Sequence, residues 1–165
     1  MSSDTPTLHL VCGKIAAGKS TLCTHLAQAD GTVLVSEDQW LRTLYGDEMK
    51  TISDFVRCSA KLRQAMTPHV IDLLKAGLPV VLDFAANTVE ARTWIRQIIA
   101  QSGADHQLHL LDPPDHVCLA RLQARNAAGN HPFQVTASDF EKISKHFQPP
   151  TPDEGFNIVV HKVSD

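Results

Sequence analysis

A short segment near the start of the chain contains the residue types that bind phosphate. Residues 13–20 match the pattern G-x-x-x-x-G-K-[ST] at every fixed position, directly after an apolar run and directly before a helical pattern. In such a loop, backbone N–H groups surround phosphate oxygens at the start of a helix, whose dipole favours anions. The predicted nucleotide ligands are Gly13, Lys14, Ile15, Ala16, Ala17, Gly18, Lys19, Ser20 and Thr21.

Three of these side chains have separate expected roles. Lys19 would contact the β- and γ-phosphates during catalysis, and Ser20 would give its hydroxyl group to Mg²⁺. Thr21 would contact the α-phosphate. ATP and Mg²⁺ are therefore the expected cofactors, and the alternative is a glycine-rich turn without a ligand.

A carboxylate that could activate an acceptor follows the next apolar run. Asp38 and Arg42 lie four residues apart, so in a helix they would share one face. Asp38 could take the proton of an acceptor hydroxyl as its oxygen attacks the γ-phosphorus, and Arg42 could bind the acceptor. The alternative is that Asp38 or Glu37 caps this helix.

The third apolar run ends in a second carboxylate. Residues 79–83 read Pro-Val-Val-Leu-Asp, a pattern that supports Mg²⁺ in P-loop proteins. We therefore predict that Asp83 is a ligand of the metal or of its bound water. Asn87 is a predicted acceptor contact, and its alternative role is to cap the next helix.

Two arginines late in the chain could act on the transferring phosphate. Arg121 and Arg125 lie about one helical turn apart, and an irregular segment with Gly129 and Pro132 follows them. We expect residues 126–136 to form a lid over ATP, with both arginines on the nucleotide and Arg125 also catalytic. The alternative is that both arginines form solvated surface pairs.

The order of the apolar runs predicts the framework that would position these residues. Five short runs alternate with helical patterns, which is typical of a parallel sheet flanked by helices, so the predicted fold class is α/β. The predicted strands are Thr7–Cys12, Thr32–Ser36, Pro79–Asp83, His106–Leu111 and Phe156–His161. A long amphipathic helix is predicted over residues 53–76, and two capping boxes, Asn87 with Glu90 and Ser138 with Glu141, predict further helix starts.

Length and composition favour one domain that acts on a small molecule. With 165 residues, of which 43% are hydrophobic, the chain fits a single domain over residues 1–165. The net charge of -3 gives no basic face for a nucleic acid, and no apolar run has membrane-spanning length. The four cysteines form no paired metal motif, and Cys12 and Cys118 lie inside apolar runs, where a reduced thiol serves as a small core residue, so the expected compartment is the reducing cytoplasm. Both a monomer and a homodimer are compatible with these features.

Taken in order, these motifs resemble a known group of enzymes. With the P-loop, Asp38 and Arg42, Asp83 and the two late arginines, the chain resembles the small P-loop kinases related to zeta toxin, chloramphenicol phosphotransferase and the polynucleotide kinase domain. It also looks like bacterial proteins described only as AAA-family ATPases. The resemblance implies a three-layer P-loop fold with five parallel strands in the order 2-3-1-4-5. It further implies that Asp38 activates the acceptor beside Arg42 and that Arg125 is the lid arginine.

Together these features predict a small-molecule kinase that moves the γ-phosphate of ATP to a hydroxyl group. Residues 36–54 contain five acidic residues against Arg42 and Lys50, so the segment would attract a cationic acceptor, such as an aminoglycoside-type antibiotic. An ordinary solvated acidic face is the alternative. Two other functions stay open: a nucleotide-dependent switch without an acceptor, and a zeta-like toxin kinase that acts on a nucleotide sugar.

Overall fold

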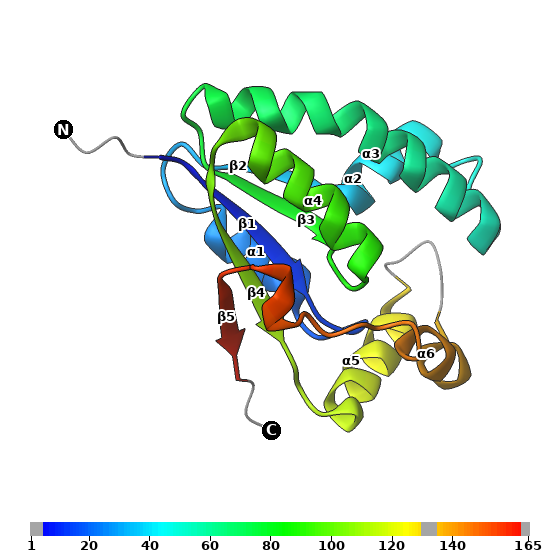
Figure 1. Cartoon of the computed structure of the whole chain (residues 1–165). Helices are drawn as coiled ribbons and strands as arrows, with labels where there is room; N and C mark the ends of the chain where they lie inside the picture. Colours follow the sequence, from blue (N-terminus) through cyan, green and yellow to red (C-terminus); the bar gives the residue numbers. More distant parts are fainter. Residues whose placement is uncertain (1–4, 130–134, 163–165) are drawn as a thin grey trace.

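The computed structural model describes residues 5–129 and 135–162, which form a parallel sheet between two layers of helices (Figure 1). The strands are β1 (Thr7–Cys12), β2 (Val33–Ser36), β3 (Val80–Ala85), β4 (Asp105–Leu111) and β5 (Ile158–His161). The helices are α1 (Lys19–Leu26), α2 (Glu37–Tyr45), α3 (Ile52–Lys75), α4 (Val89–Ser102), α5 (Asp115–Ala128), α6 (Ala137–Ser144) and the short 3₁₀ turn η1 (Pro152–Glu154).

The sheet has the order β2-β3-β1-β4-β5, and all four pairings are parallel. Both the α/β class and the strand order are therefore confirmed. Each predicted strand is present; β1 has its predicted ends, and the ends of the other strands differ by at most two residues. A predicted strand end differs from the observed one where the apolar run is longer or shorter than the stretch of chain that forms the hydrogen bonds of the sheet.

Alternating side chains of β1 separate the two faces of the sheet. Leu8 and Leu10 belong to the largest apolar core, together with buried residues of α3 and α4. Val11 points to the other face, where it packs with Cys23 of α1 and Val81 of β3. Because both faces are covered, the central strands are apolar along most of their length.

Helix starts differ from the predicted ones because nearby threonines provide the caps. The hydroxyl of Thr51 caps α3, Thr88 caps α4 and Thr136 caps α6, each by accepting from a backbone N–H three residues later. The two predicted capping boxes are therefore wrong in position. The box at α6 pairs Thr136 with Asp139, and a box also begins α3, where Asp54 accepts from the backbone N–H of Thr51 at 3.2 Å.

A buried arginine fastens the segment before β5 to the rest of the fold. Arg92 is fully buried, and its Nε donates to Oε1 of Glu154 at 2.6 Å. Its Nη1 donates to the backbone oxygen of Ala86 at 2.9 Å, just after β3. The carboxylate and the carbonyl compensate a charge that would otherwise be costly to bury. The chain therefore returns from α6 to the sheet along a fixed path.

No helix in the described part of the chain is long and apolar enough to cross a membrane.

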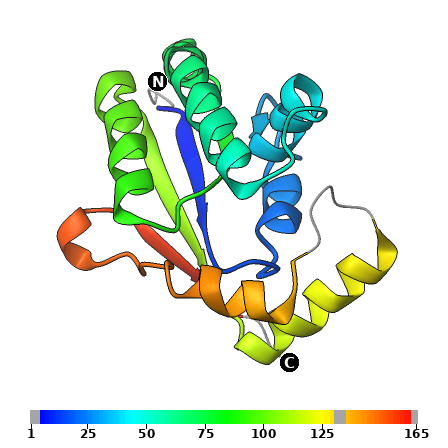
Figure 2. The same ribbon diagram turned by 90° about the vertical axis from the view of Figure 1, so that its right-hand side faces the viewer.

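Helices α5 and α6 lie at the carboxyl ends of the strands (Figure 2). There, Phe140 of α6 is buried against Leu111, Cys118 and Leu122. The helices at this edge are therefore packed onto the sheet rather than separate from it.

Three histidines form a hydrogen-bonded row across the sheet. Nδ1 of His9 lies 3.1 Å from Nε2 of His109, and Nδ1 of His109 lies 2.8 Å from Nε2 of His161. Each neutral imidazole has one donor and one acceptor nitrogen, so the row can be satisfied without a charge. Burial, followed by repulsion from the other two histidines, lowers the pKa of His109 to about 4.

This row makes stability depend on pH. Below the ordinary histidine pKa of 6.5, the unfolded chain takes up a proton at His109, whereas the folded chain resists it down to about pH 4. The contribution to the free energy of unfolding should therefore fall, by at most about 1.4 kcal/mol per pH unit, as the pH drops through this window. Urea unfolding at several pH values should show a smaller slope for His109→Gln. The exposed His25→Gln variant is the control, and an unchanged slope in His109→Gln would contradict the assignment.

Candidate active site

The glycine-rich loop joins β1 to α1 and has the backbone shape of an anion site. Ala16 and Gly18 have positive φ angles of 63° and 105°, and Gly18 is the N-cap of α1. Gly13 lies so close to the sheet that an added Cβ would be 2.8 Å from the backbone oxygen of Leu111. Alternating backbone conformations of this kind turn successive N–H groups toward one concave space at a helix start. The loop therefore fits the predicted phosphate site.

Lys19 is folded over this loop. Its ammonium group donates to the backbone oxygens of Gly13 and Lys14, the second at 2.8 Å. Burial lowers the pKa of Lys19, whereas the nearby Asp83 acts in the opposite direction. A partly desolvated ammonium group gains more from a phosphate than a fully solvated one does. The position of Lys19 thus agrees with its predicted contact with the β- and γ-phosphates.

Ser20 and Asp83 meet where a magnesium ion is expected. The Ser20 hydroxyl donates to Oδ2 of Asp83 at 3.3 Å, and burial followed by repulsion from Asp38 raises the pKa of Asp83. Both ligands are oxygens, which Mg²⁺ prefers, and Mg²⁺ commonly uses one or two protein ligands with phosphates and water. In residues 5–129 and 135–162, no group of three or more histidine, cysteine or acidic side chains could hold a metal alone. The pair fits a metal that binds together with nucleotide.

Asn87 contacts the loop rather than open space. Its Oδ1 accepts from the backbone N–H of Gly13 at 2.9 Å, and its Nδ2 donates to the backbone oxygen of Gly13 at 2.8 Å. Thr88, not Asn87, caps α4. Asn87 therefore supports the phosphate loop from β3. Its predicted contact with the acceptor stays a prediction, and that contact would require these bonds to rearrange.

Asp38 and Arg42 lie on the first two turns of α2, beyond the carboxyl end of β2. Ser36 caps this helix by accepting from the backbone N–H of Gln39 at 3.3 Å, so neither Asp38 nor Glu37 has that task. Both Asp38 and Arg42 are exposed. Asp38 is also close enough to Asp83 to raise the pKa of that carboxyl group. The register of β2 with β3 pairs Ser36 with Asp83, so the predicted acceptor-side carboxylate follows the direct neighbour of the predicted metal-side one by two residues.

The two late arginines have different positions. Nη1 of Arg121 donates to the backbone oxygens of Ala16 and Ala17, at 3.3 and 3.1 Å, so Arg121 binds the loop itself. Arg125 lies near Lys19, whose pKa it helps to lower, and its Nε is buried without a hydrogen-bond partner. A buried unpaired donor is unfavourable, and a phosphate oxygen would satisfy it. Arg125 is therefore the better candidate for the transferring phosphate.

The predicted lid over residues 126–136 is only partly described, because residues 130–134 lie outside the described part. Its two ends are joined: Nδ2 of Asn126 donates to the backbone oxygen of Val135 at 2.6 Å. Asn126 lies in the last turn of α5, and Val135 is followed directly by the cap of α6. The segment therefore leaves and rejoins the fold at one point beside Arg125, and its closure over ATP stays a prediction.

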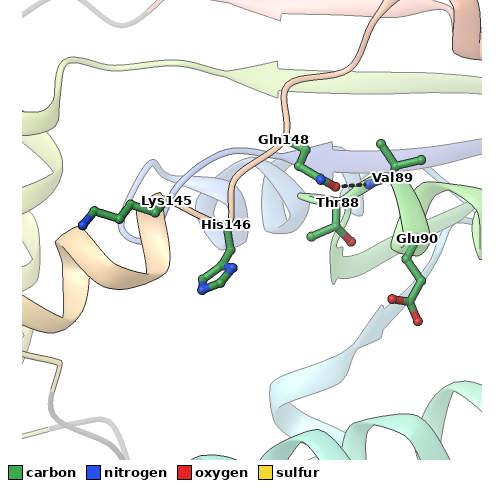
Figure 3. Close-up of a pocket in the computed structure, with 6 residues that line it drawn as sticks. All are labelled: Thr88, Val89, Glu90, Lys145, His146 and Gln148. Carbon is green, nitrogen blue, oxygen red and sulfur yellow. Dashed lines mark hydrogen bonds between the residues drawn. The ribbon is translucent and has the colours of Figure 1, made fainter.

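A polar cavity of about 470 Å³ lies between the start of α4 and the segment after α6. Its lining is Thr88, Val89, Glu90, Lys145, His146 and Gln148, and Figure 3 shows these side chains on two separate segments. The two segments are joined by a hydrogen bond from the backbone N–H of Val89 to Oε1 of Gln148 at 2.8 Å. Neither Asn87 nor any residue of the phosphate loop lines this cavity.

Removal of the Arg125 side chain should reduce turnover more than nucleotide affinity. A guanidinium group that pairs with the γ-phosphate only as charge develops acts mainly in the transition state. We expect Arg125→Ala to lower kcat by about 10- to 100-fold, with a smaller change in the Kd of ATP. Steady-state kinetics and calorimetry would measure both, and the exposed Arg96→Ala variant on α4 is the control. An equal loss of affinity and turnover would instead make Arg125 a ground-state ligand.

Comparison with known proteins connects this site to a family and a fold. Residues 8–150 match the model of the family AAA_33, described as an AAA domain. A search of curated proteins gave no match. A presumed kinase from Chloroflexus aurantiacus has a similar structure, with a TM-score of 0.79 and 19% identity over 98% of this chain and 87% of that one.

Two further solved structures share the fold. A gluconokinase from Sinorhizobium meliloti 1021 is 17% identical over 98% of this chain and 85% of that one, with a TM-score of 0.61. The APS kinase CysC from Mycobacterium tuberculosis, solved with AMPPNP and APS, is 20% identical over 94% and 88%, with a TM-score of 0.61. At these identities the similarity shows the fold alone.

Proposed function

The chain belongs to the AAA_33 family of AAA domains, and on this premise we propose that it is an ATP-dependent kinase that phosphorylates a hydroxyl group of a small molecule. The two relatives named as kinases of small acceptors support this class, because they share the whole fold. The observation that carries the proposal is the position of Asp38. It is an exposed carboxylate two residues after Ser36, which pairs with Asp83 across β2 and β3, and it lies on a helix that does not need it as a cap.

The residues around the loop would bind and orient ATP. Backbone N–H groups of residues 13–20 would surround the phosphates, and the Lys19 ammonium group would exchange its bonds with loop carbonyls for bonds with the β- and γ-phosphates. Mg²⁺, held by Ser20 and Asp83, would supply charge neutralisation at the phosphates. The Nε–H of Arg125, which has no hydrogen-bond partner in the structure, would donate a hydrogen bond to the γ-phosphoryl group.

Transfer would then proceed in line. The acceptor oxygen forms a bond to the γ-phosphorus as the bond between that phosphorus and the β–γ bridging oxygen breaks, which releases ADP. The hydroxyl proton passes to the Asp38 carboxylate, and Arg42, one turn later on α2, would hold the acceptor. Lys19 and Arg125 would stabilise the charge that develops on the transferring group.

The acidic residues of the segment 36–54 favour a cationic acceptor less than their number indicates. Asp54 accepts hydrogen bonds from the backbone N–H groups of Lys50 and Thr51, and Glu37 is buried beside Arg63. Two of the five acidic residues are therefore already occupied within the protein. An aminoglycoside-type acceptor remains a proposal, and none of the relatives compared supports a role in antibiotic resistance.

Release of ADP, measured with and without added acceptors, tests the proposed function. We would screen sugars and sugar acids, polyols, nucleosides and aminoglycosides in parallel with ATP·Mg²⁺. A kinase should show acceptor-dependent ADP release and a phosphorylated product by mass spectrometry. A nucleotide-dependent switch would bind ATP but show no acceptor-dependent release with any compound, and this outcome would overturn the proposal.

A further inference from the structure

A second polar cluster lies next to Asp38, between α2, α3 and α4. Oε2 of Glu37 accepts from the Ser59 hydroxyl at 2.5 Å and lies 3.9 Å from Nε of Arg63. The guanidinium carbon of Arg63 lies 5.2 Å from the centroid of the Trp94 ring, so the group is stacked on an aromatic surface. Glu37 and Arg63 are therefore held by contacts on three helices.

The aromatic support is itself fixed. The indole N–H of Trp94 donates to the Thr67 hydroxyl at 2.7 Å, and that hydroxyl donates to the backbone oxygen of Arg63 at 2.7 Å. Trp94 also lies against Phe84 of β3, with ring centroids 5.5 Å apart. A side chain that is stacked and restrained in this way loses little conformational entropy when it binds a ligand.

Both members of the pair keep one polar edge open. The Glu37 side chain is 10% exposed and the Arg63 side chain 31% exposed. Within the described residues, Oε1 of Glu37 and the two terminal nitrogens of Arg63 have no hydrogen-bond partner, and none of these three atoms is among the buried unpaired ones. These three atoms therefore keep some solvent-accessible surface, whereas Nε of Arg63 is buried and makes no hydrogen bond.

The open edge borders the proposed reaction site. Glu37 directly precedes Asp38 at the end of β2, and Asp38 and Asp83 both act electrostatically on the Glu37 carboxyl group. A ligand at the pair would therefore extend toward the carboxylate that we expect to activate the acceptor hydroxyl. By contrast, the cavity beside α4 is lined by none of these residues.

The chemistry of the pair selects one type of ligand. A carboxylate oxygen accepts hydrogen bonds and guanidinium nitrogens donate them, so together they match two neighbouring hydroxyl groups. Their charges compensate each other, so a polycation would be repelled by Arg63 and a strong anion by Glu37 and Asp38. We propose that Glu37 and Arg63 form a subsite for two adjacent hydroxyl groups of the acceptor, which is a polyol or sugar. This proposal rests on the proposed kinase function, whose acceptor it narrows.

Kinetics with matched variants test the subsite. Glu37→Gln keeps the shape of the side chain, and Arg63→Met keeps the apolar stem on Trp94. With the best polyol or sugar from the screen, each should raise KM for the acceptor at least about tenfold and leave the Kd of ATP unchanged. Arg57→Met is the control, because Arg57 is an exposed arginine of the same helix that pairs with Asp54. Unchanged KM in both Glu37→Gln and Arg63→Met would overturn the subsite while the kinase function stands.

A binding measurement gives a readout that does not depend on turnover. The chain has two tryptophans, so in a Trp40→Phe background the fluorescence comes from Trp94, directly beneath Arg63. With AMPPNP·Mg²⁺ present, ribitol, glucose, myo-inositol, 2′-deoxyadenosine and kanamycin would be titrated separately. A saturable change with a polyol or sugar, lost in Arg63→Met, supports the proposal. Saturation with kanamycin or 2′-deoxyadenosine alone, or with none of the five, would overturn it. Loss of acceptor-dependent ADP release despite polyol binding would instead refute the kinase function.

Discussion

Asp38→Asn should bind ATP·Mg²⁺ almost normally and lose acceptor phosphorylation by about 10²- to 10⁴-fold. The substitution keeps the size of the side chain but removes the carboxylate that takes the acceptor proton. The phosphate loop, Ser20 and Asp83 would still hold nucleotide, because none of them is bonded to Asp38 in the structure. Nucleotide affinity by calorimetry and turnover by ADP release would separate the two effects.

Asp47→Asn is the matched control for this prediction, since Asp47 is an exposed carboxylate shortly after α2. Full turnover in Asp38→Asn would place the general base elsewhere, with Glu37 or Asp83 the next candidates. A complete loss of ATP binding would place Asp38 in the metal site. In that case the roles assigned to the carboxylates after β2 and β3 would have to be exchanged.

Lys19→Ala should reduce phosphoryl transfer by about 10²- to 10³-fold or more and also weaken ATP binding. Lys19 is expected to contact the β- and γ-phosphates in both the ground state and the transition state, so kcat and the Kd of ATP should both change. Its folded-state partners are two loop carbonyls, and its burial is unfavourable for the charged form. Loss of the side chain should therefore leave the Tm nearly unchanged.

Lys61→Ala, at an exposed position of α3, is the control for the loss of a lysine. Thermal unfolding, ATP calorimetry and ADP release would be measured on the wild-type protein, Lys19→Ala and Lys61→Ala. Normal turnover in Lys19→Ala would refute the kinase proposal itself. A large decrease in Tm would show that Lys19 stabilises the apo fold, and the loss of activity could then not be assigned to phosphate contact.

Local patterns were sufficient to predict most of the framework. Apolar runs of strand length marked all five strands, and the helical spacing from Phe55 to Leu74 marked α3 to within one residue at each end. The failures concern helix starts. At α4 and α6 a threonine outside the predicted box provides the cap, because several polar residues compete for the same backbone N–H groups.

Among the site residues, too, some positions could be predicted from the sequence and others could not. The P-loop was predictable because one continuous segment supplies the backbone and side chains that phosphate requires. Asn87 could be placed near the site, but not on Gly13, because its two hydrogen bonds depend on the pairing of β1 with β3. Likewise, nothing in the spacing of Arg121 and Arg125 indicates that one binds the loop while the other, half-buried, lies near Lys19 with its Nε enclosed.

The sequence alone determined the α/β class, the phosphate loop and the candidate carboxylates at strand ends, because each depends on residues within one turn or one strand of each other. Only the tertiary structure decided which of these side chains meet. The pairing of β2 with β3 sets Ser36 beside Asp83, so that Asp38 acts electrostatically on Asp83, and the packing of α2 on α3 pairs Glu37 with Arg63. Such contacts depend on the register of strands and the rotation of helices, quantities that residue type and spacing leave open.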